Sequence, residues 1–222
     1  MTDMHVLPGA GAPAEPVHRP TRFYRFAAIV SWPVVFGLYR FKQRGLDKVP
    51  AAGGFVLAAN HNSNFDPWPL GAAFFPGRYL RFMTKSELFW WPLRVLLEWG
   101  GAFPVNRKEA DVKAIQTAVE LCRCGHIVVM FPEGTRRRKG LRKRTRPKAR
   151  PGAALIALRA GVPLVPAAVL GTDKLGRLQP LRVHYGEPIP LADLQGVELR
   201  EAAQIATERL MAEIARLESV EY

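Results

Sequence analysis

After residue 50, hydrophobic residues occur in short runs that alternate with segments of helical spacing. Residues 53–60 (GGFVLAAN) and 126–131 (HIVVMF) are almost continuously apolar, which is typical of strands buried on both faces. Further short runs predict strands at residues 79–85, 101–106, 163–170 and 181–186. This alternation indicates an α/β fold with a mixed, largely parallel central sheet flanked by helices.

The segments between these runs carry the spacing and end signals of helices. Pro67 favours a helix start and predicts a helix over residues 67–75. Ser86 is a suitable cap for a helix that starts at Glu87 and continues to residue 99. Further helices are predicted over residues 109–123, 151–161 and 198–217, with Val112, Ile115, Val119 and Cys122 on the inner side of the first.

The N-terminal segment differs from the rest of the chain. Residues 1–20 contain four prolines and no apolar run, which predicts a disordered tail and argues against a secretory signal. In the next unit, residues 21–45, the uncharged stretch at 26–39 spans 14 residues, whereas a helix that crosses a bilayer needs about 20. Its basic flanks and its proline favour a kinked, membrane-associating helical anchor at the interface. The alternative is a buried helix packed on the remaining domain, residues 46–222.

Charge and cysteine content narrow the classes of partner. Of the net charge of +13, residues 136–150 carry +10, with ten Lys or Arg and no acidic residue. Such a segment cannot pack into a core, so we expect a solvated loop that attracts phosphate groups of a nucleic acid, a ligand or an anionic lipid. Cys122 and Cys124 are too close for an easy disulfide and too few for a four-ligand zinc site, so we expect reduced thiols and no metal.

The stretch LAANHNSNFDPWPL at residues 57–70 places six polar side chains between apolar ones. In a regular helix His61 and Asp66 would point about 140° apart, so a helix would not pair them. Asp66 precedes Pro67, however, and a residue before proline is disfavoured in the helical conformation. We therefore expect Asp66 to be the N-cap of a helix, and the turn after the strand to bring its carboxylate to His61. The neighbouring asparagines, which we expect to satisfy backbone groups of the turn, are Asn60, Asn62 and Asn64.

A histidine paired with a carboxylate is a candidate general base. The imidazole can accept a proton near neutral pH, while the carboxylate fixes its tautomer and stabilises the cation that forms. The alternative is that Asp66 only caps a helix and His61 only closes a strand. Ser63 could complete a Ser-His-Asp set, but it lies in the same turn and lacks the G-x-S-x-G elbow that presents a serine nucleophile.

Two later stretches carry residues suited to binding a phosphate. Arg107 ends the stretch FPVNR, and an arginine at a strand end offers two parallel donors to a phosphate, although such a residue is more often a solvated surface side chain. In FPEGTR at 131–136, a glycine allows close approach of a ligand to the backbone, and the neighbouring residues offer donors and positive charge. The alternative is a tight turn with an ion pair. Its candidate binding residues are Glu133, Gly134, Thr135 and Arg136.

Together these stretches resemble the ordered motifs of a known family. N-H-x-x-x-x-D at residues 60–66, F-P-V-x-R at 103–107, F-P-E-G-T-R at 131–136 and V-P-L-V-P at 162–166 are similar to the four motifs of the glycerolipid acyltransferases. The resemblance is to the bacterial 1-acyl-glycerol-3-phosphate acyltransferases within that family, and it covers about residues 50–190. The first and third motifs in this order are highly specific.

The resemblance implies a reaction and a role for each matched residue. His61, oriented by Asp66, would remove a proton from the free hydroxyl of 1-acyl-glycerol 3-phosphate. The oxygen would then attack the thioester of acyl-CoA or acyl-carrier protein directly, giving phosphatidic acid without a further cofactor. Family members usually carry a Phe before the Lys/Arg-x-Gly that follows the third motif, whereas here Ala149 precedes Arg150. The residues expected to hold the glycerol phosphate are Arg107, Glu133, Gly134, Thr135 and Arg136.

The resemblance also implies a partner for the anchor and the basic loop. An enzyme that takes a substrate from a bilayer must sit on it, which favours a peripheral or monotopic position on the cytoplasmic face of the cell membrane. One rival is an acyltransferase with another lysophospholipid or glycolipid acceptor. A second is a nucleic-acid-binding module built on residues 136–150, but that loop contains no aromatic residue for base stacking. A third, a thioesterase or lipase, needs a nucleophile that the sequence does not present.

Overall fold

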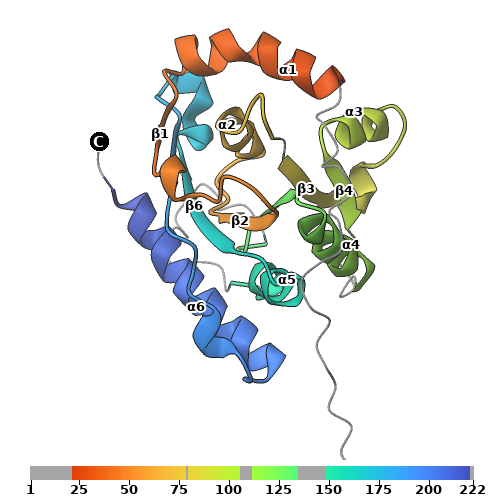
Figure 1. The fold of residues 1–222 in the computed structure, drawn as a ribbon. Helices are drawn as coiled ribbons and strands as arrows, with labels where there is room; N and C mark the ends of the chain where they lie inside the picture. Colours follow the sequence, from red (N-terminus) through yellow and green to blue (C-terminus); the bar gives the residue numbers. More distant parts are fainter. Residues whose placement is uncertain (1–21, 79, 106–111, 135–148, 221–222) are drawn as a thin grey trace, which may run out of the picture.

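The computed structural model describes residues 22–78, 80–105, 112–134 and 149–220. Its centre is a seven-stranded sheet with the strand order β1-β7-β6-β2-β5-β3-β4 (Figure 1). All neighbouring strands are parallel except β6 and β7, which confirms the mixed, largely parallel sheet. The strands are β1 (Lys42–Arg44), β2 (Phe55–Ala59), β3 (Leu80–Lys85), β4 (Ala102–Val105), β5 (Ile127–Met130), β6 (Leu164–Leu170) and β7 (Arg182–Tyr185).

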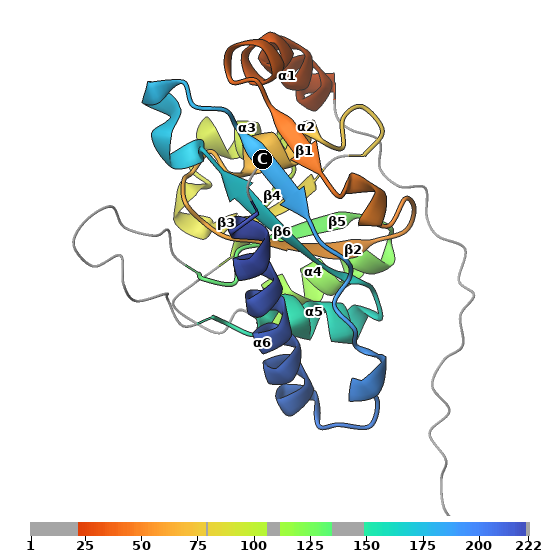
Figure 2. The same cartoon turned by 90° about the vertical axis from the view of Figure 1, so that its left-hand side faces the viewer.

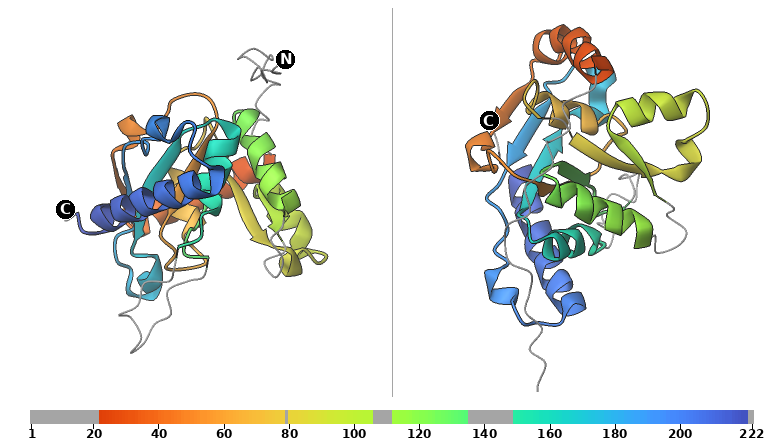
Figure 3. Two further views of the ribbon diagram at one scale, coloured as in Figure 1. Left: turned by 90° about the horizontal axis from the view of Figure 1, so that it is seen from below. Right: turned by 45° about the vertical axis from the view of Figure 1, so that its right-hand side comes forward.

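Helices cover both faces of this sheet. The α-helices are α1 (Arg22–Trp32), α2 (Pro67–Ala72), α3 (Leu93–Trp99), α4 (Val112–Arg123), α5 (Gly152–Ala160) and α6 (Leu199–Glu218). Helices α4, α5 and α6 lie on one face, while α1 and α2 lie on the other (Figures 1 and 2). Seen from below, α4, α5 and α6 form one continuous layer over the strands (Figure 3). The short helical turns are η1 (Pro33–Leu38), η2 (Leu46–Lys48), η3 (Ser86–Leu88), η4 (Thr172–Arg177) and η5 (Ala192–Leu194).

Strand β2 lies at the centre of this sandwich. Its residues alternate between the two cores: Val56 and Ala58 pack among residues of α4, α5 and α6, whereas Phe55, Leu57 and Ala59 pack on the face of α2 and η1. All five side chains are fully buried. Because both faces of this strand are buried, polar and apolar residues do not alternate along it, which explains its continuous hydrophobic run. The chain therefore leaves β2 from the middle of the molecule, with β5 on one side and β6 on the other.

Two helix predictions need correction. The predicted helix over residues 87–99 is instead a short 3-10 turn, η3, followed by α3 from Leu93. Pro92 accounts for the break, because proline has no N–H to donate and its ring clashes with the preceding helical turn. In α4, Val112 was expected on the inner side, but its side chain is 57% exposed at the first position of the helix. The buried side of α4 is formed by Ala114, Ala118, Val119 and Cys122.

The predicted anchor, residues 21–45, is helical only in its first part. Helix α1 continues at Pro33 into the π-helical turn η1, which ends at Leu38. Residues 42–44 are instead the edge strand β1, which pairs with β7 and thereby belongs to the sheet. Within the described ranges, no helix is both long and apolar enough to cross a membrane. The predicted disordered tail, residues 1–20, and nearly all of the basic loop 136–150 lie outside the described residues.

Candidate active site

The turn after β2 brings His61 and Asp66 together. His61 lies two residues beyond the end of β2, and Asp66 lies immediately before α2. The imidazole Nδ1 is 2.8 Å from Oδ2 of Asp66. The Asp66 side chain is fully buried, and the His61 side chain is 13% exposed. The two residues therefore form a pair in which the carboxylate is shielded from solvent and the imidazole is partly exposed.

Each oxygen of the Asp66 carboxylate is held by donors. Besides His61, Oδ2 accepts hydrogen bonds from the backbone N–H groups of Asn62 and Ser63 at 2.8 and 2.9 Å. Oδ1 accepts a hydrogen bond of 2.5 Å from the hydroxyl of Thr172, the first residue of η4. These bonds compensate for the burial of the carboxylate and fix its orientation. Because a carboxylate only accepts, Nδ1 of His61 carries the proton in this pair, and Nε2 is left as the proton acceptor.

The backbone of Asp66 differs from the sequence prediction. It lies at the N-cap position of α2 as expected, but its φ of −55° and ψ of −37° are helical, and its side chain makes no capping bond to the helix. The carboxylate points back along the chain and accepts from the N–H groups of the preceding turn instead. Pro67, which has no N–H, opens the helix. An aspartate before a helix usually caps it through its side chain. The Asp66 carboxylate instead pairs with His61 and closes the turn.

Phe131 fixes the plane of the imidazole. Its ring stacks on that of His61, with centroids 4.2 Å apart and planes inclined by 19°. Phe131 follows β5, which is the parallel neighbour of β2, so the carboxyl ends of these two strands meet at the same edge of the sheet. The stretch FPEGTR therefore begins in direct contact with the candidate base. The sequence pattern had indicated no separate role for Phe131.

The turn after Phe131 carries the described part of the predicted phosphate site. Glu133 is buried, and Gly134 has a φ of +66°, a conformation that favours glycine. The N–H of Arg150 donates to Pro132 O at 2.8 Å, and its side chain lies against Gly134 so closely that a Cβ there would be 3.0 Å from Nε. Arg150 thus reaches the turn although Ala149 replaces the usual phenylalanine before it. Arg107, Thr135 and Arg136 lie outside the described residues, and their roles stay predictions.

Asn60 and Asn62 join the turn after β2 to β6. Asn60 donates through Nδ2 to Val169 O at 3.0 Å and accepts from Val169 N at 2.7 Å through Oδ1. Its Nδ2 also lies 2.7 Å from Oε1 of Glu218 at the end of α6, and Asn62 donates to Val169 O at 3.0 Å. The side chain of Asn60 continues the ladder between β2 and β6 where the backbone leaves it. The expectation that these asparagines satisfy backbone groups of the turn itself was wrong, because they bind the neighbouring strand.

An apolar groove of about 410 Å³ extends between α1 and α2 and reaches the turn after β2. Phe65, from the turn between His61 and Asp66, forms part of its lining, and Trp68 contributes from α2. Helix α1 supplies most of the opposite wall, with Tyr24, Ala28 and Trp32 among the lining residues. The N-terminal helix therefore forms one side of an apolar groove that reaches the turn between His61 and Asp66.

Comparison with known proteins places this architecture in a family. The family model described as "Acyltransferase" matches residues 40–170. A 1-acyl-sn-glycerol-3-phosphate acyltransferase of Bacillus subtilis (strain 168) is 34% identical over 179 residues, which cover 78% of this chain and 85% of that protein. The chloroplastic enzyme BAT2 of Brassica napus, also called a 1-acyl-sn-glycerol-3-phosphate acyltransferase, is 30% identical over 162 residues, and the match covers 69% of this chain but only 44% of the plant protein.

A solved structure has the same fold. The crystal structure of the 1-acyl-sn-glycerophosphate (LPA) acyltransferase PlsC from Thermotoga maritima superimposes with a TM-score of 0.62. The alignment covers 90% of this chain and 80% of that chain, at 23% sequence identity. At this identity the likeness concerns the fold, a largely parallel sheet flanked by helices.

Proposed function

The chain belongs to the acyltransferase family and is an O-acyltransferase, and from this premise we propose that it acylates the free hydroxyl of 1-acyl-glycerol 3-phosphate, forming phosphatidic acid. The acyl group comes from a thioester, either acyl-CoA or acyl-carrier protein. The names of the Bacillus and Brassica relatives, both 1-acyl-sn-glycerol-3-phosphate acyltransferases, support this acceptor. The observation that carries the proposal is the pairing of the buried Asp66 with His61, because it supplies a general base at the edge of the sheet where the first and third family motifs meet.

The geometry supports a direct transfer in one addition and one elimination. Nε2 of His61 accepts the proton of the acceptor hydroxyl while its oxygen attacks the thioester carbonyl. The tetrahedral intermediate collapses with cleavage of the C–S bond, and the departing thiolate takes the proton back from the imidazolium. Asp66 stabilises this cation through Nδ1. Hydrogen bonding of the two Asp66 oxygens to Thr172 and to the turn supports its role as the group that orients the base.

Ser63 is not suited to act as a nucleophile. Its hydroxyl accepts a hydrogen bond from the N–H of Phe65 at 3.3 Å, and its own N–H donates to Asp66. The serine therefore stabilises the turn, whereas a nucleophile activated by His61 would lie within hydrogen-bond reach of its ring. This arrangement favours attack by the acceptor hydroxyl itself over a reaction through an acyl-enzyme.

The acceptor phosphate is assigned to the turn after β5. Contact between Phe131 and His61 supports this assignment, because it places FPEGTR beside the base. Glu133 and Gly134 come from the described part of the turn, and Arg107, Thr135 and Arg136 complete the proposed set. Arg150 joins this set on structural grounds, since its guanidinium lies against Gly134.

The acceptor is a membrane lipid, and α1 has the surface to meet a bilayer. None of its residues is buried, and Phe26 on its outer side is 64% exposed. Between β3 and α3, Trp90 and Trp91 are 58% and 81% exposed, and tryptophan favours the headgroup region of membranes. Figure 3 shows the segment of α3 beside the end of α1. We infer that both segments rest on the cytoplasmic surface of the cell membrane, aided by the basic loop 136–150, at about 1 kcal/mol per Lys or Arg near anionic lipid.

Two rival functions predict different substrates. Another lysophospholipid or a glycolipid acceptor would use the same base but another head group. A nucleic-acid-binding module would use residues 136–150, and it would bind RNA or DNA as tightly as it binds anionic vesicles of equal charge.

Neutralising five charges of the basic loop 136–150 should weaken vesicle binding without slowing turnover in detergent.

Acyl transfer by the purified full-length chain tests the proposal. Acyl-CoA and acyl-carrier protein are each offered with 1-acyl-glycerol 3-phosphate, glycerol 3-phosphate, lysophosphatidylcholine and a glycolipid, and both free thiol and lipid product are measured. Phosphatidic acid should form from 1-acyl-glycerol 3-phosphate at a much higher kcat/KM than any other product. Preference for another acceptor by tenfold or more would replace the proposed substrate and leave the acyltransferase activity in place.

A further inference from the structure

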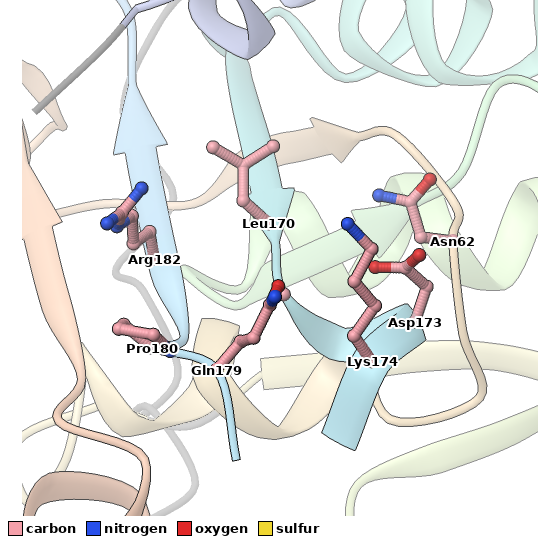
Figure 4. A pocket seen from close by; sticks show the side chains of 8 residues that line it. Asn62, Leu170, Asp173, Lys174, Gln179, Pro180 and Arg182 are labelled. Atoms are coloured by element: carbon pink, nitrogen blue, oxygen red, sulfur yellow. The ribbon is translucent and has the colours of Figure 1, made fainter. Parts of the chain in front are cut away.

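A cavity of about 480 Å³ with a mixed polar and apolar lining lies on the other side of the turn after β2 from the turn after β5. It is bounded by the end of β6, by η4 with the residues that follow it, and by the start of β7 (Figure 4). Because β2 has β5 on one side and β6 on the other, the turn after β5 and this cavity flank His61 on opposite sides. In open α/β sheets, ligands bind beyond the carboxyl ends of such central strands. We call this cavity the β6 pocket.

Two residues connect the β6 pocket to the base. Asn62, which lines the pocket, directly follows His61. Thr172 lies within the wall of the pocket, between the lining residues Gly171 and Asp173, and its hydroxyl holds Asp66. A group bound in the pocket would therefore lie near the turn that carries His61 and Asp66.

The lining is rich in donors and carries a positive balance. Lys174 and Arg182 contribute two cations, and Asp173 contributes one acid. Figure 4 shows Lys174 and Asn62 on one side of the pocket and Arg182 on the other, with Gln179 between them. Cationic and amide N–H groups that line one space are suited to the oxygens of a phosphate.

The wall that carries Lys174 is fixed in place. Gly171 has a φ of +92° and packs so tightly that a Cβ there would be 2.5 Å from Pro180 O. The hydroxyl of Tyr39 donates to Leu175 O at 3.3 Å, and Arg40 donates to Leu178 O at 3.1 Å. These contacts hold the segment from Gly171 to Leu178 at both ends and in its middle, so ligand binding does not have to order this wall of the pocket.

We propose that the β6 pocket is a second anion subsite, which binds a phosphate group of a substrate, separate from the phosphate site at FPEGTR. This inference rests on the proposed function, in which both substrates carry phosphate: the acceptor in its head group, and the donor in the phosphopantetheine arm of CoA or of the carrier protein. An anion subsite on the β6 side of the base would bind the phosphate of one substrate while the turn after β5 binds that of the other. The shared ligand chemistry is a phosphate ester, and the two sources are distinguished by experiment.

The test compares Lys174→Ala with Arg177→Ala in the full-length protein. Both side chains are exposed cations of η4, but only Lys174 lines the pocket. KM is measured for each substrate with the other saturating. Loss of a charge-assisted hydrogen bond should raise KM for one substrate by about tenfold with kcat nearly unchanged, because the bond is made equally in the ground and transition states. Arg177→Ala should leave both KM values unchanged.

The identity of the substrate affected assigns the source of the phosphate. A higher KM for 1-acyl-glycerol 3-phosphate assigns the pocket to the acceptor, and a higher KM for the thioester assigns it to the donor. Asp173→Asn should lower the same KM, since it removes the one acid of the lining. KM values within twofold of the wild type for both substrates in Lys174→Ala would overturn the subsite.

A binding measurement without turnover separates this inference from the proposed function. Inorganic pyrophosphate is titrated calorimetrically into the wild type, Lys174→Ala and Arg182→Gln, with thermal melting as a check of folding. Weaker binding in Lys174→Ala, with Arg177→Ala as the matched control, supports the subsite even if the preferred acceptor is another lipid. Equal binding in Lys174→Ala and Arg177→Ala contradicts it, and this comparison holds even if Arg182→Gln fails to fold.

Discussion

The hydroxyl of Thr172 donates a hydrogen bond to Oδ1 of Asp66, so the carboxylate that faces His61 is held by a residue 106 positions later in the chain. Both residues are buried, and the bond joins the turn after β2 to the segment after β6. The bond joins Thr172 to the carboxylate, not to the imidazole or to the space in front of its Nε2. We therefore regard it as a positioning residue for the proposed base.

Thr172→Val should lower kcat by about tenfold to a hundredfold, because a buried carboxylate loses a hydrogen bond of about 1.5–3 kcal/mol and one of the donors that fix its orientation toward the imidazole. KM should change little, and the conservative Thr172→Ser should recover most of the rate because it restores the donor. Steady-state kinetics over a range of pH measures both effects. A variant that lost thermal stability but kept kcat would indicate a structural role alone.

His61→Ala should abolish acyl transfer, and Asp66→Asn should reduce kcat by at least about a hundredfold, since general bases and their orienting groups contribute factors of this size. Ser63→Ala is the matched control from the same turn, and it should retain full activity because, among the described residues, its hydroxyl bonds only to the N–H of Phe65. Thiol release on adding acyl-CoA and acceptor gives the rate. Loss of activity in Ser63→Ala would revive a serine nucleophile.

Asn60→Ala should lower the free energy of unfolding by about 2–4 kcal/mol, because two hydrogen bonds to the backbone of Val169 disappear in a buried site. Asn64 is exposed in the same turn, so Asn64→Ala should change the stability by less than about 0.5 kcal/mol. Urea unfolding followed by circular dichroism provides both values. Equal stability of the two variants would show that the link between β2 and β6 contributes little.

Replacing Trp90 and Trp91 by serine should weaken partitioning into anionic vesicles by about tenfold, because exposed indole rings bind the headgroup region. Val112→Ser is the control, since this exposed apolar side chain lies on α4, on the face of the sheet opposite α1. Vesicle sedimentation measures binding, and a detergent assay should show unchanged turnover. If Val112→Ser weakens vesicle binding as much as the double variant, the proposed orientation on the membrane is wrong.

Cys122 should resist alkylation in the native protein. Burial raises the pKa of its thiol to about 12, so the reactive thiolate is scarce at pH 8 and is further shielded by the core. Cys124 is only half-buried, so a maleimide should modify one thiol per native chain and two after unfolding in guanidinium. In Cys124→Ser, native labelling should nearly vanish, and rapid labelling there would show that α4 opens readily.

The sequence predicted features that depend on near neighbours. The apolar run of β2 and the proline at the start of α2 are local signals, and each appears where it was expected. The meeting of His61 and Asp66 was also predictable, because only a short turn separates them. The family motifs identified the same pair.

Contacts between distant strands were not predictable from the same signals. Thr172, Phe131 and Asn60 gain their contacts at the site because β5 and β6 lie on either side of β2, and strand order depends on packing of the whole chain. The helical backbone of Asp66 was missed for a related reason. Local preference before proline is weak compared with hydrogen bonds that bury a carboxylate among several donors.

The family match ends at residue 170, two residues before the threonine that holds Asp66. Asn60 similarly contacts Glu218 at the far end of α6. A protein engineer who moved only the matched segment into a new host would carry the histidine and the aspartate but leave their support behind. The motifs alone therefore do not carry the support of the proposed base, and we expect substitutions in η4 or at the end of α6 to lower the activity of a chain whose motifs are all intact.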